Sequence, residues 1–380
     1  MLGRLFSKKK IEINRHLFYE TSHSPSLLDI VGEEMLKKVI DFCFIANPYY
    51  PNKRLLKKLQ RKLPTVIKSY PSSNPKLSQE YLSKVLNVSP KHLVIGNGAT
   101  ELITLIEKDL IDDVAIPIPT FSEYTEKLRK SESAKLFQLP ADNDYQLNLN
   151  DYADWIDNNN ISSALIINPG NPTGQLIGAA EMLEFVAKMS HLKLIILDES
   201  FIDFAGNNIP SLLQSIEKFN NLLIVRSMSK HCGVPGLRLG YCCTSNEQIL
   251  CHLRKFIPAW NINTLAEYFL TQLWKTDKEY HIARKKVVAD VQDLYLQLKS
   301  INGFYAYETG CNFILVKVNC GMNATELQKR LLEEYYVYIR DCSNKIGLDN
   351  YHIRVASQGF KKDKYLVKAL REISKECLSK

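Results

Sequence analysis

The sequence lacks several features that would assign it at once to a particular class of protein. It has no Cys-x-x-Cys pair, although cysteine occurs 9 times, and an odd number of scattered thiols favours neither a disulfide framework nor a zinc ribbon. No apolar run approaches the roughly 18 residues that span a bilayer, and no internal repeat or low-complexity stretch is visible. We therefore predict a folded, cytoplasmic protein with reduced thiols, no metal site and no membrane partner.

The sequence also has only a small excess of positive charge. The 380 residues include 49 Lys and Arg against 41 Asp and Glu, and the net charge of +8 is spread along the chain. Because nucleic-acid-binding proteins gather basic side chains into a patch or stripe, this distribution argues against a nucleic-acid partner and suits a small anionic ligand better. With 45% hydrophobic residues, a chain of this length buries a sizeable core, divided over about two or three domains.

Short runs that are apolar on both faces alternate with helical patterns in the middle of the chain. The predicted strands lie at 93–96, 114–118, 164–168, 194–198, 222–227 and 237–244. Apolar residues at helical spacing follow at 99–108, 121–130 and 179–189. Buried strands that alternate with helices indicate a mostly parallel sheet with crossover helices. The fold prediction is therefore α/β, with a three-layer large domain over residues 61–270.

The rest of the chain has a different pattern. Beyond residue 264 long helical spacing is followed by an α+β arrangement, with predicted strands at 313–318, 336–340 and 351–356, a helix near 324–335 and a last helix ending at Leu378. This arrangement predicts a smaller α+β domain over 271–380. Residues 1–60 are polar and irregular, and we assign them to the same small domain.

Two charged residues stand at the ends of predicted buried strands. Asp198 ends the run LIILD, at the sheet edge where open α/β proteins bind ligands, although it could instead cap the following turn. Lys230 follows the run LLIVRS in the motif SMSK. Burial lowers the pKa of a lysine and so allows its neutral amine to form a Schiff base. An exposed loop lysine is the alternative.

The residues around Lys230 suit a phosphate group. Ser227 and Ser229 flank it, and Arg238 follows on the next predicted strand, so hydroxyls and a guanidinium can donate to one dianion. The segment GNGATE at 96–101 opens a helix whose backbone amides can face an anion. An ordinary strand-to-helix turn would look similar, and the P-loop pattern of nucleotide-binding proteins is absent.

The motif NPGNPTG at 168–174 contains two Asn-Pro steps and two glycines. So rigid a turn indicates that the backbone must present one side chain accurately, and Asn171 is the candidate. An ordinary turn is the alternative for this heptapeptide.

In chain order, the segments GNGATE, PTFSEY, NPGNPTG, LDESF, SMSK, GLRLG and RVAS resemble the motifs of fold-type I pyridoxal-phosphate enzymes of the class I/II aminotransferase superfamily. The resemblance covers nearly the whole chain. Within the superfamily the sequence is most similar to histidinol-phosphate aminotransferases, through ANPYYP at 46–51, and to threonine-phosphate decarboxylases, through LDESFIDF and YIRDCSN.

The resemblance implies pyridoxal 5'-phosphate as the cofactor and gives each matched residue a role. Lys230 would hold the cofactor aldehyde and move a proton, and Asp198 would pair with the pyridine nitrogen. Asn171 would donate to the phenolic oxygen and face the substrate. Phe121 would stack on the ring, unless it is a core residue, and Phe201 stands where many aminotransferases have a tyrosine. The residues implied at the cofactor phosphate are Gly98, Ala99, Thr100, Ser227, Ser229, Arg238 and, from the neighbouring subunit, Tyr70.

Three further matched residues concern the substrate. Arg354 in HIRVAS matches an arginine that binds a substrate carboxylate or phosphate, and Arg340 matches a second arginine of the phosphate-using groups. Two guanidiniums in one pocket repel each other unless a dianion or two anions lie between them, which predicts a small phosphorylated substrate. A surface ion pair is the alternative for Arg340. Tyr49 would add its phenol across the interface of a homodimer with shared active sites.

The resemblance leaves the reaction open. We predict an aminotransferase acting on a small phosphorylated amine, ketone or amino acid, with glutamate or alanine as the amino donor. The alternative is a decarboxylase of threonine phosphate or serine phosphate, because both reactions use the same electron sink and differ in which Cα bond lies perpendicular to the ring. A regulator that binds the cofactor without turnover is a third alternative, but the chain before Asn47 is too short for a DNA-binding module and a linker.

Overall fold

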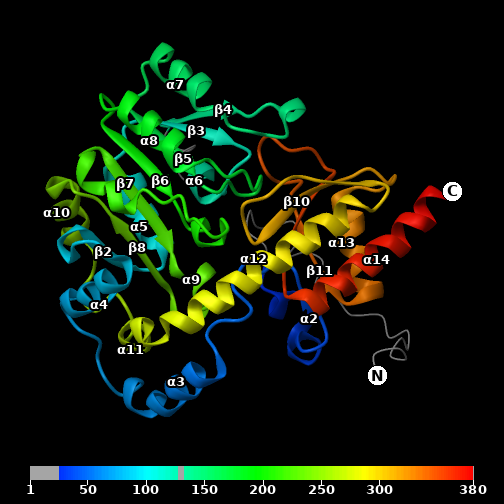
Figure 1. Ribbon diagram of the computed structural model, residues 1–380, viewed down its shortest axis with the longest axis horizontal. Coiled ribbons are helices and arrows are strands. Elements are labelled where there is room, and N and C mark those ends of the chain that lie inside the picture. The colour runs from blue at the N-terminus through cyan, green and yellow to red at the C-terminus, as the bar shows by residue number, and fades with distance from the viewer. Residues whose placement is uncertain (1–24, 127–131, 380) are drawn as a thin grey trace.

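The computed structural model describes residues 25–126 and 132–379. Within them, a sheet of seven strands runs through the larger half of the molecule (Figure 1). In spatial order its strands are β2 (Leu93–Asn97), β8 (Leu239–Cys243), β7 (Leu222–Ser227), β6 (Leu194–Asp198), β5 (Ser163–Ile167), β3 (Val114–Ile118) and β4 (Ala134–Gln138). Only β8 is antiparallel to its neighbours. The predicted mostly parallel sheet is therefore confirmed.

Helices cover both faces of this sheet. Ile195 and Leu197 of β6 lie in one core cluster, whereas Leu194 and Ile196 lie in the other, as the alternation of side chains along a strand requires. The first cluster receives side chains from α4 (Lys76–Leu86), α7 (Leu149–Asn158), α8 (Ala179–Lys188) and α11 (Thr264–Leu273). The second receives them from α5 (Ala99–Asp109), α6 (Glu123–Glu126) and α10 (Glu247–Phe256). The result is the predicted three-layer α/β arrangement.

A smaller antiparallel sheet occupies the other half of the molecule. Its strands, in spatial order, are β12 (Arg340–Asp341), β13 (His352–Ala356), β10 (Phe313–Val318) and β9 (Phe304–Ala306). The helices packed with it are α12 (Asp277–Lys299), α13 (Ala324–Tyr335) and α14 (Phe360–Leu378). Near it, β1 (Ile40–Asp41) pairs with β11 (Val337–Tyr338), and α2 (Leu27–Leu36) packs beside them. The fold prediction of an α/β unit with a smaller α+β part is confirmed.

Some predicted elements differ from the structure. The single strand predicted over 336–340 is two short strands in different sheets, because β11 pairs with β1 while β12 pairs with β13. β4 was not predicted, since it lies at the edge of its sheet and its residues are exposed or half-buried. The helix predicted over 121–130 begins at Glu123, and residues 127–131 lie outside the described residues.

The long helix α12 connects the two halves (Figure 1). Its Ala283 belongs to the core around the large sheet, and its Val291 belongs to the core around the small one. The segment before the large sheet is also shared, because α3 (Lys53–Val66) packs Leu55 and Leu59 into the core of the large sheet. The predicted boundary at residue 60 thus falls inside α3, and residues 1–24 of the predicted small domain lie outside the described residues. The division at residue 270 stays a prediction.

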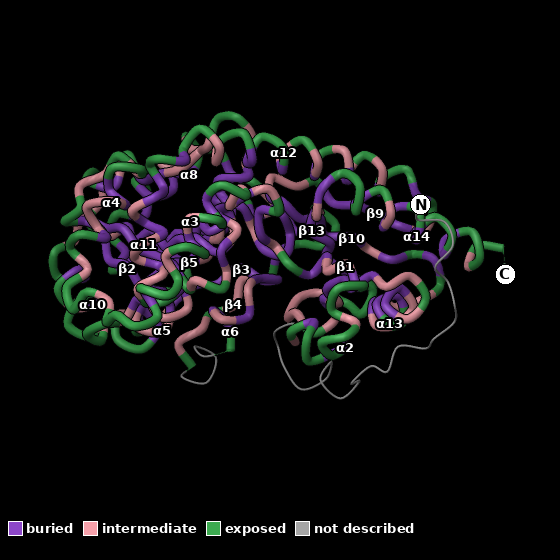
Figure 2. The backbone as a smooth tube through the Cα atoms, turned by 90° about the horizontal axis from the view of Figure 1, so that it is seen from below, coloured by how far each residue is buried: buried purple, intermediate pink, exposed green. Residues whose placement is uncertain are grey.

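Burial is concentrated along the strands, while the outer turns of the helices are exposed (Figure 2). Short 3-10 helices link the elements at Pro90–His92, Ala141–Asn143, Ile202–Phe204, Leu213–Lys218, Pro235–Leu237 and Trp274–Thr276, and one further turn of helix, α9 (Met228–His231), follows β7. Across residues 25–126 and 132–379, no helix is long and apolar enough to cross a bilayer.

Candidate active site

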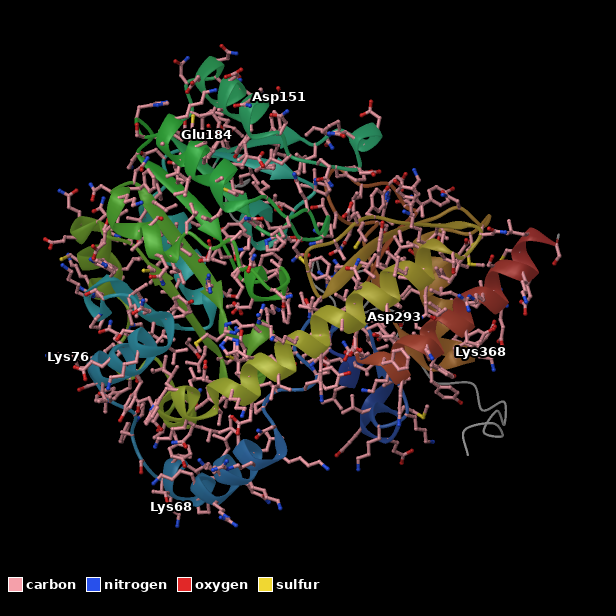
Figure 3. The ribbon with its side chains drawn as sticks, viewed as in Figure 1. Lys68, Lys76, Asp151, Glu184, Asp293 and Lys368 are labelled. Atoms are coloured by element: carbon pink, nitrogen blue, oxygen red, sulfur yellow. The ribbon has the colours of Figure 1, made fainter. Side chains whose placement is uncertain are left out.

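The carboxyl ends of the parallel strands β5, β6 and β7 meet at one cavity. Many of the predicted cofactor-binding residues line it, namely Ala99, Thr100, Phe121, Asn171, Asp198, Phe201, Ser227, Ser229, Lys230 and Arg238. Its empty volume is about 640 Å³. Charged residues on the outer elements, such as Lys76 and Asp151, lie instead at the periphery (Figure 3). The fold therefore brings together residues that are far apart in the sequence.

Lys230 enters this cavity from α9, directly after β7. Its ammonium nitrogen lies 5.9 Å from the centre of the Phe201 ring. Desolvation and the nearby charges of Arg354 and Arg238, opposed by Asp198, together lower the pKa of Lys230 to about 8. The neutral fraction of the amine near neutral pH is therefore much larger than for an ordinary lysine, and a neutral amine is the form that attacks an aldehyde.

Asp198 is the last residue of β6 and is 4% exposed. One carboxylate oxygen accepts a hydrogen bond from the Tyr124 hydroxyl at 3.0 Å, and the other accepts one from the Ser200 backbone N–H at 2.9 Å. Burial raises the pKa of Asp198, while these hydrogen bonds and the charge of Lys230 lower it. Within the described part of the chain no cation forms an ion pair with this carboxylate, so it can still accept a charged N–H donor.

A cradle of donors lies where α5 begins. Gly98 has φ 83°, and a Cβ at this position would lie 2.5 Å from the terminal nitrogen of Arg238, so glycine allows the guanidinium to approach the first turn of α5. Ser229 is buried, and its hydroxyl has no hydrogen-bond partner among the described residues. A helix N-terminus, a guanidinium and an unpartnered hydroxyl together form a site for an anion.

Two buried arginines lie on the small sheet, and one of them contacts Asn171, which lines the cavity. Arg354 and Arg340 are each 8% exposed and are directly paired across β13 and β12. One terminal nitrogen of Arg354 donates to the side-chain oxygen of Asn171 at 2.8 Å, and its Nε lacks a partner among the described residues. Burial and the charge of Arg340 lower the pKa of Arg354. With so little exposure, Arg340 is not the surface arginine that the sequence left as an alternative.

Two predicted tyrosines lie away from this group. Tyr70 is 84% exposed, with its ring centre 5.5 Å from that of Trp260. The Tyr49 hydroxyl donates to the carboxylate of Asp290 on α12 of the same chain. Both roles depend on a second subunit, and both stay predictions.

A buried ion network lies behind the cavity. Arg226 donates to Glu199 at 2.6 Å and contacts Asp203 at 3.4 Å. Asp203 also accepts a hydrogen bond from Tyr280 at 2.7 Å, and Tyr280 contacts His231 at 3.0 Å. Since Glu199 and His231 each adjoin a predicted catalytic residue in the sequence, the network holds the ends of β6 and β7 in position.

The family model described as aminotransferase class I and II matches residues 37–370. The chain belongs to this family. An L-serine phosphate decarboxylase from Campylobacter jejuni is 33% identical over 93% of this chain and 94% of its own length. The solved structure of a decarboxylase from Sulfurospirillum multivorans has a TM-score of 0.79 and 31% identity, and covers 90% of this chain and 97% of its own. A histidinol-phosphate aminotransferase from Clostridium acetobutylicum has a TM-score of 0.82 and 27% identity, with 89% and 100% covered.

The cofactor of this class I and II family member is pyridoxal 5'-phosphate, and the cavity fits its three polar parts. The Lys230 amine suits the aldehyde, the buried Asp198 carboxylate suits a protonated pyridine nitrogen, and the donors near α5 suit the phosphate. No group of three or more metal-binding side chains occurs in the described segments. The resemblance read from the motifs is thus confirmed at the level of family, fold and cofactor.

The predicted aminotransferase activity, with glutamate or alanine as donor, is wrong. Two relatives at 33% identity over most of their length are L-serine phosphate decarboxylases, which favours the decarboxylase alternative. The motifs could not distinguish the two reactions, because most of their residues are assigned to cofactor binding and both reactions use the same cofactor.

Sequence reasoning also missed Tyr124, whose hydroxyl donates to Asp198. Tyr124 follows Phe121 by three residues in PTFSEY. This spacing was the feature of the sequence that could have indicated it.

Proposed function

We propose that this protein is a pyridoxal-phosphate-dependent decarboxylase of L-serine phosphate. The reaction breaks the bond between Cα and the carboxylate, releases CO2 and adds one proton to Cα, which leaves ethanolamine phosphate. The observation that carries the proposal is the pair of buried arginines, Arg340 and Arg354, in a chain similar along nearly its whole length to an L-serine phosphate decarboxylase.

The arginine pair argues for a phosphorylated substrate. Arg340 and Arg354 are direct partners on neighbouring antiparallel strands and share a buried environment. Two guanidiniums held so close repel each other, and the Nε of Arg354 has no partner among the described residues. A phosphate dianion can accept hydrogen bonds from both guanidiniums and reduces this repulsion. We therefore assign the substrate phosphate to this pair.

The same assignment favours loss of the carboxylate. If the phosphate occupies both arginines, neither guanidinium is left to hold the substrate carboxylate. A carboxylate that these cations do not hold would be free to leave as CO2 when its bond to Cα breaks. When bound, the cofactor supplies the sink for the electron pair of that bond.

The residues of the chain then have separate tasks. With the cofactor bound, the Asp198 carboxylate, which Tyr124 and Ser200 keep in place, would face the pyridine nitrogen and favour its protonated form. Lys230 would hold the cofactor, and its amine would donate a proton to the Cα of the substrate. Ser229, Arg238 and the first turn of α5 bind the cofactor phosphate.

We also propose a homodimer with shared active sites, in which Tyr70 reaches the cofactor phosphate of the partner subunit. Trp260 beside Tyr70 is exposed, and so are large apolar side chains in and next to α3 and α4, which supports a covered surface; the latter are Leu56, Leu63, Ile67 and Leu77. None of the nine cysteines, all of which lie in the described part of the chain, forms a disulfide, which supports an enzyme of the reducing cytoplasm.

The test is an assay that separates the two reactions of this family. The purified enzyme with its cofactor is mixed with L-serine phosphate, and CO2 and ethanolamine phosphate are measured together with any 2-oxo acid. Two comparison substrates are included: L-threonine phosphate, which has one methyl group more, and L-serine, which has no phosphate. We expect stoichiometric CO2 and ethanolamine phosphate from L-serine phosphate; formation of a 2-oxo product without CO2 would refute the proposal.

A further inference from the structure

A second cavity lies beside the cofactor cavity. Its lining residues are Ile118, Thr120, Ser122, Thr125, Glu126, Asn344, Lys345 and Ile346, around an empty volume of about 770 Å³. The two cavities are neighbours, since Phe121 lines the first while Thr120 and Ser122, on either side of it in the chain, line the second. A substrate that extends away from the cofactor ring therefore has a second space beside it.

Lys345 is the cation of this second cavity. Its ammonium donates a hydrogen bond to the Ser122 hydroxyl. Desolvation and the charges of Arg340 and Arg354 together lower the pKa of Lys345 to about 8, while Cys342 and Glu126 act in the opposite direction. In the segments that the structure describes, no carboxylate lies within ion-pair distance of this ammonium.

The loop that carries Lys345 is joined to the arginine pair. A terminal nitrogen of Arg340 donates to the side-chain oxygen of Asn344 at 2.8 Å, and both Asn344 and Lys345 line the second cavity. The positive charges of Lys345, Arg340 and Arg354 are therefore near one another. The Lys345 ammonium donates its hydrogen bond to a neutral hydroxyl. Such a concentration of positive charge is stabilised by an anion with more than one charge.

We propose that Lys345 binds the substrate phosphate together with Arg340 and Arg354 and so sets the preference for phosphorylated over unphosphorylated serine. This inference rests on the proposed function, because it concerns the same substrate. The phosphate would accept hydrogen bonds from two guanidiniums and one ammonium, with Ser122 keeping the ammonium in place. The competing interpretation is that Lys345 only ties its loop to the Ser122 hydroxyl.

Binding measurements on the holoenzyme distinguish the two interpretations. The probes are ethanolamine phosphate and inorganic phosphate, with dissociation constants from calorimetry, so the readout does not depend on turnover. The variants are Lys345→Gln, which removes the charge, and Lys345→Arg, which keeps it. Lys317→Gln is the matched control, since Lys317 is a lysine of the small sheet paired with Asp349 at 3.4 Å.

We expect Lys345→Gln to weaken the binding of ethanolamine phosphate by at least about 10-fold, the size of one charge-assisted hydrogen bond. Lys345→Arg should recover most of the affinity, and Lys317→Gln should change it by less than about 2-fold, as for an exposed ion pair. The melting temperature of each variant is measured alongside. Equal affinity of Lys345→Gln and Lys317→Gln, or failure of Lys345→Arg to recover binding in a folded protein, overturns the inference.

The same measurements separate this inference from the proposed function. If the native enzyme binds ethanolamine phosphate through Lys345 but releases no CO2 from L-serine phosphate, the decarboxylase assignment is wrong and the phosphate site stands. If it releases CO2 while Lys345→Gln binds both probes as tightly as the native enzyme, the phosphate role of Lys345 is wrong and the decarboxylase stands. Absence of binding of either probe to the native enzyme rejects the site.

Discussion

Replacing Asp198 by asparagine tests the centre of the proposed mechanism. The carboxylate is 4% exposed and forms no ion pair among the described residues, so its charge is available to a protonated pyridine nitrogen. Asparagine has nearly the same shape but no charge. The substitution therefore removes one electrostatic interaction and leaves the packing of the site almost unchanged.

The size of the effect follows from burial. Two unit charges about 4 Å apart interact by roughly 4 kcal/mol at the effective dielectric constant of about 20 that suits protein sites. A loss of about 4 kcal/mol from the transition state lowers the rate by roughly 10³-fold. We expect kcat for CO2 release by Asp198→Asn to fall by about that factor.

A matched variant separates charge from hydrogen bonding. Tyr124→Phe keeps the Asp198 carboxylate and removes only the hydroxyl that donates to it at 3.0 Å. Its loss should be about 10- to 100-fold, as expected for one hydrogen bond to a charged group of roughly 1.5–3 kcal/mol. A much larger loss in Asp198→Asn than in Tyr124→Phe identifies the charge as the active feature.

The folding of the variant is measured separately. Burial raises the pKa of Asp198 in the folded state, so its ionised form costs stability as the pH rises through that pKa. Asparagine removes this cost, but its amide has one acceptor oxygen in place of two, so one of the hydrogen bonds from the Ser200 N–H and the Tyr124 hydroxyl is lost. The free energy of unfolding should therefore change by no more than about 1–2 kcal/mol. Unchanged kcat in a cofactor-loaded Asp198→Asn enzyme would refute the assigned role of this carboxylate.

Three further outcomes are expected. Arg340→Ala should lower kcat/KM for L-serine phosphate by at least about 10-fold and affect any reaction of unphosphorylated L-serine much less; equal losses on both substrates would indicate a scaffold role. Because the pKa of Lys230 is lowered to about 8, the rate at which the cofactor-free enzyme takes up pyridoxal phosphate should rise from pH 6 and level off above pH 8, as the amine loses its proton. This rate is measured from the absorbance of the bound cofactor. A pH-independent rate would contradict the assignment of Lys230. Finally, mixing Lys230→Ala subunits with Tyr70→Ala subunits should restore activity in heterodimers, since one of the two sites then has both side chains, and no recovery after demonstrated subunit exchange would argue against a shared site.

The amino-acid pattern was enough to predict the strands that are buried on both faces. Runs such as LIILD are apolar without interruption, because a central parallel strand contacts helices on both sides of the sheet. The same reasoning could not find β4, because it lies at the edge of the sheet and its residues are half-buried or exposed. It also merged β11 and β12, because the pairing of a two-residue strand depends on its partner rather than on its own side chains.

The motifs likewise carried the residues that hold the cofactor, because each of these lies at the end of a strand whose position the chain order determines. Which side chains from other elements contact these residues depends on the tertiary structure. Tyr124 reaches Asp198 through the packing of α6, and Lys345 comes near Arg340 and Arg354 through the loop that contains Asn344. Lys345 has no signal in the sequence, since a lone lysine in a loop is an ordinary surface residue until the fold places two buried guanidiniums beside it.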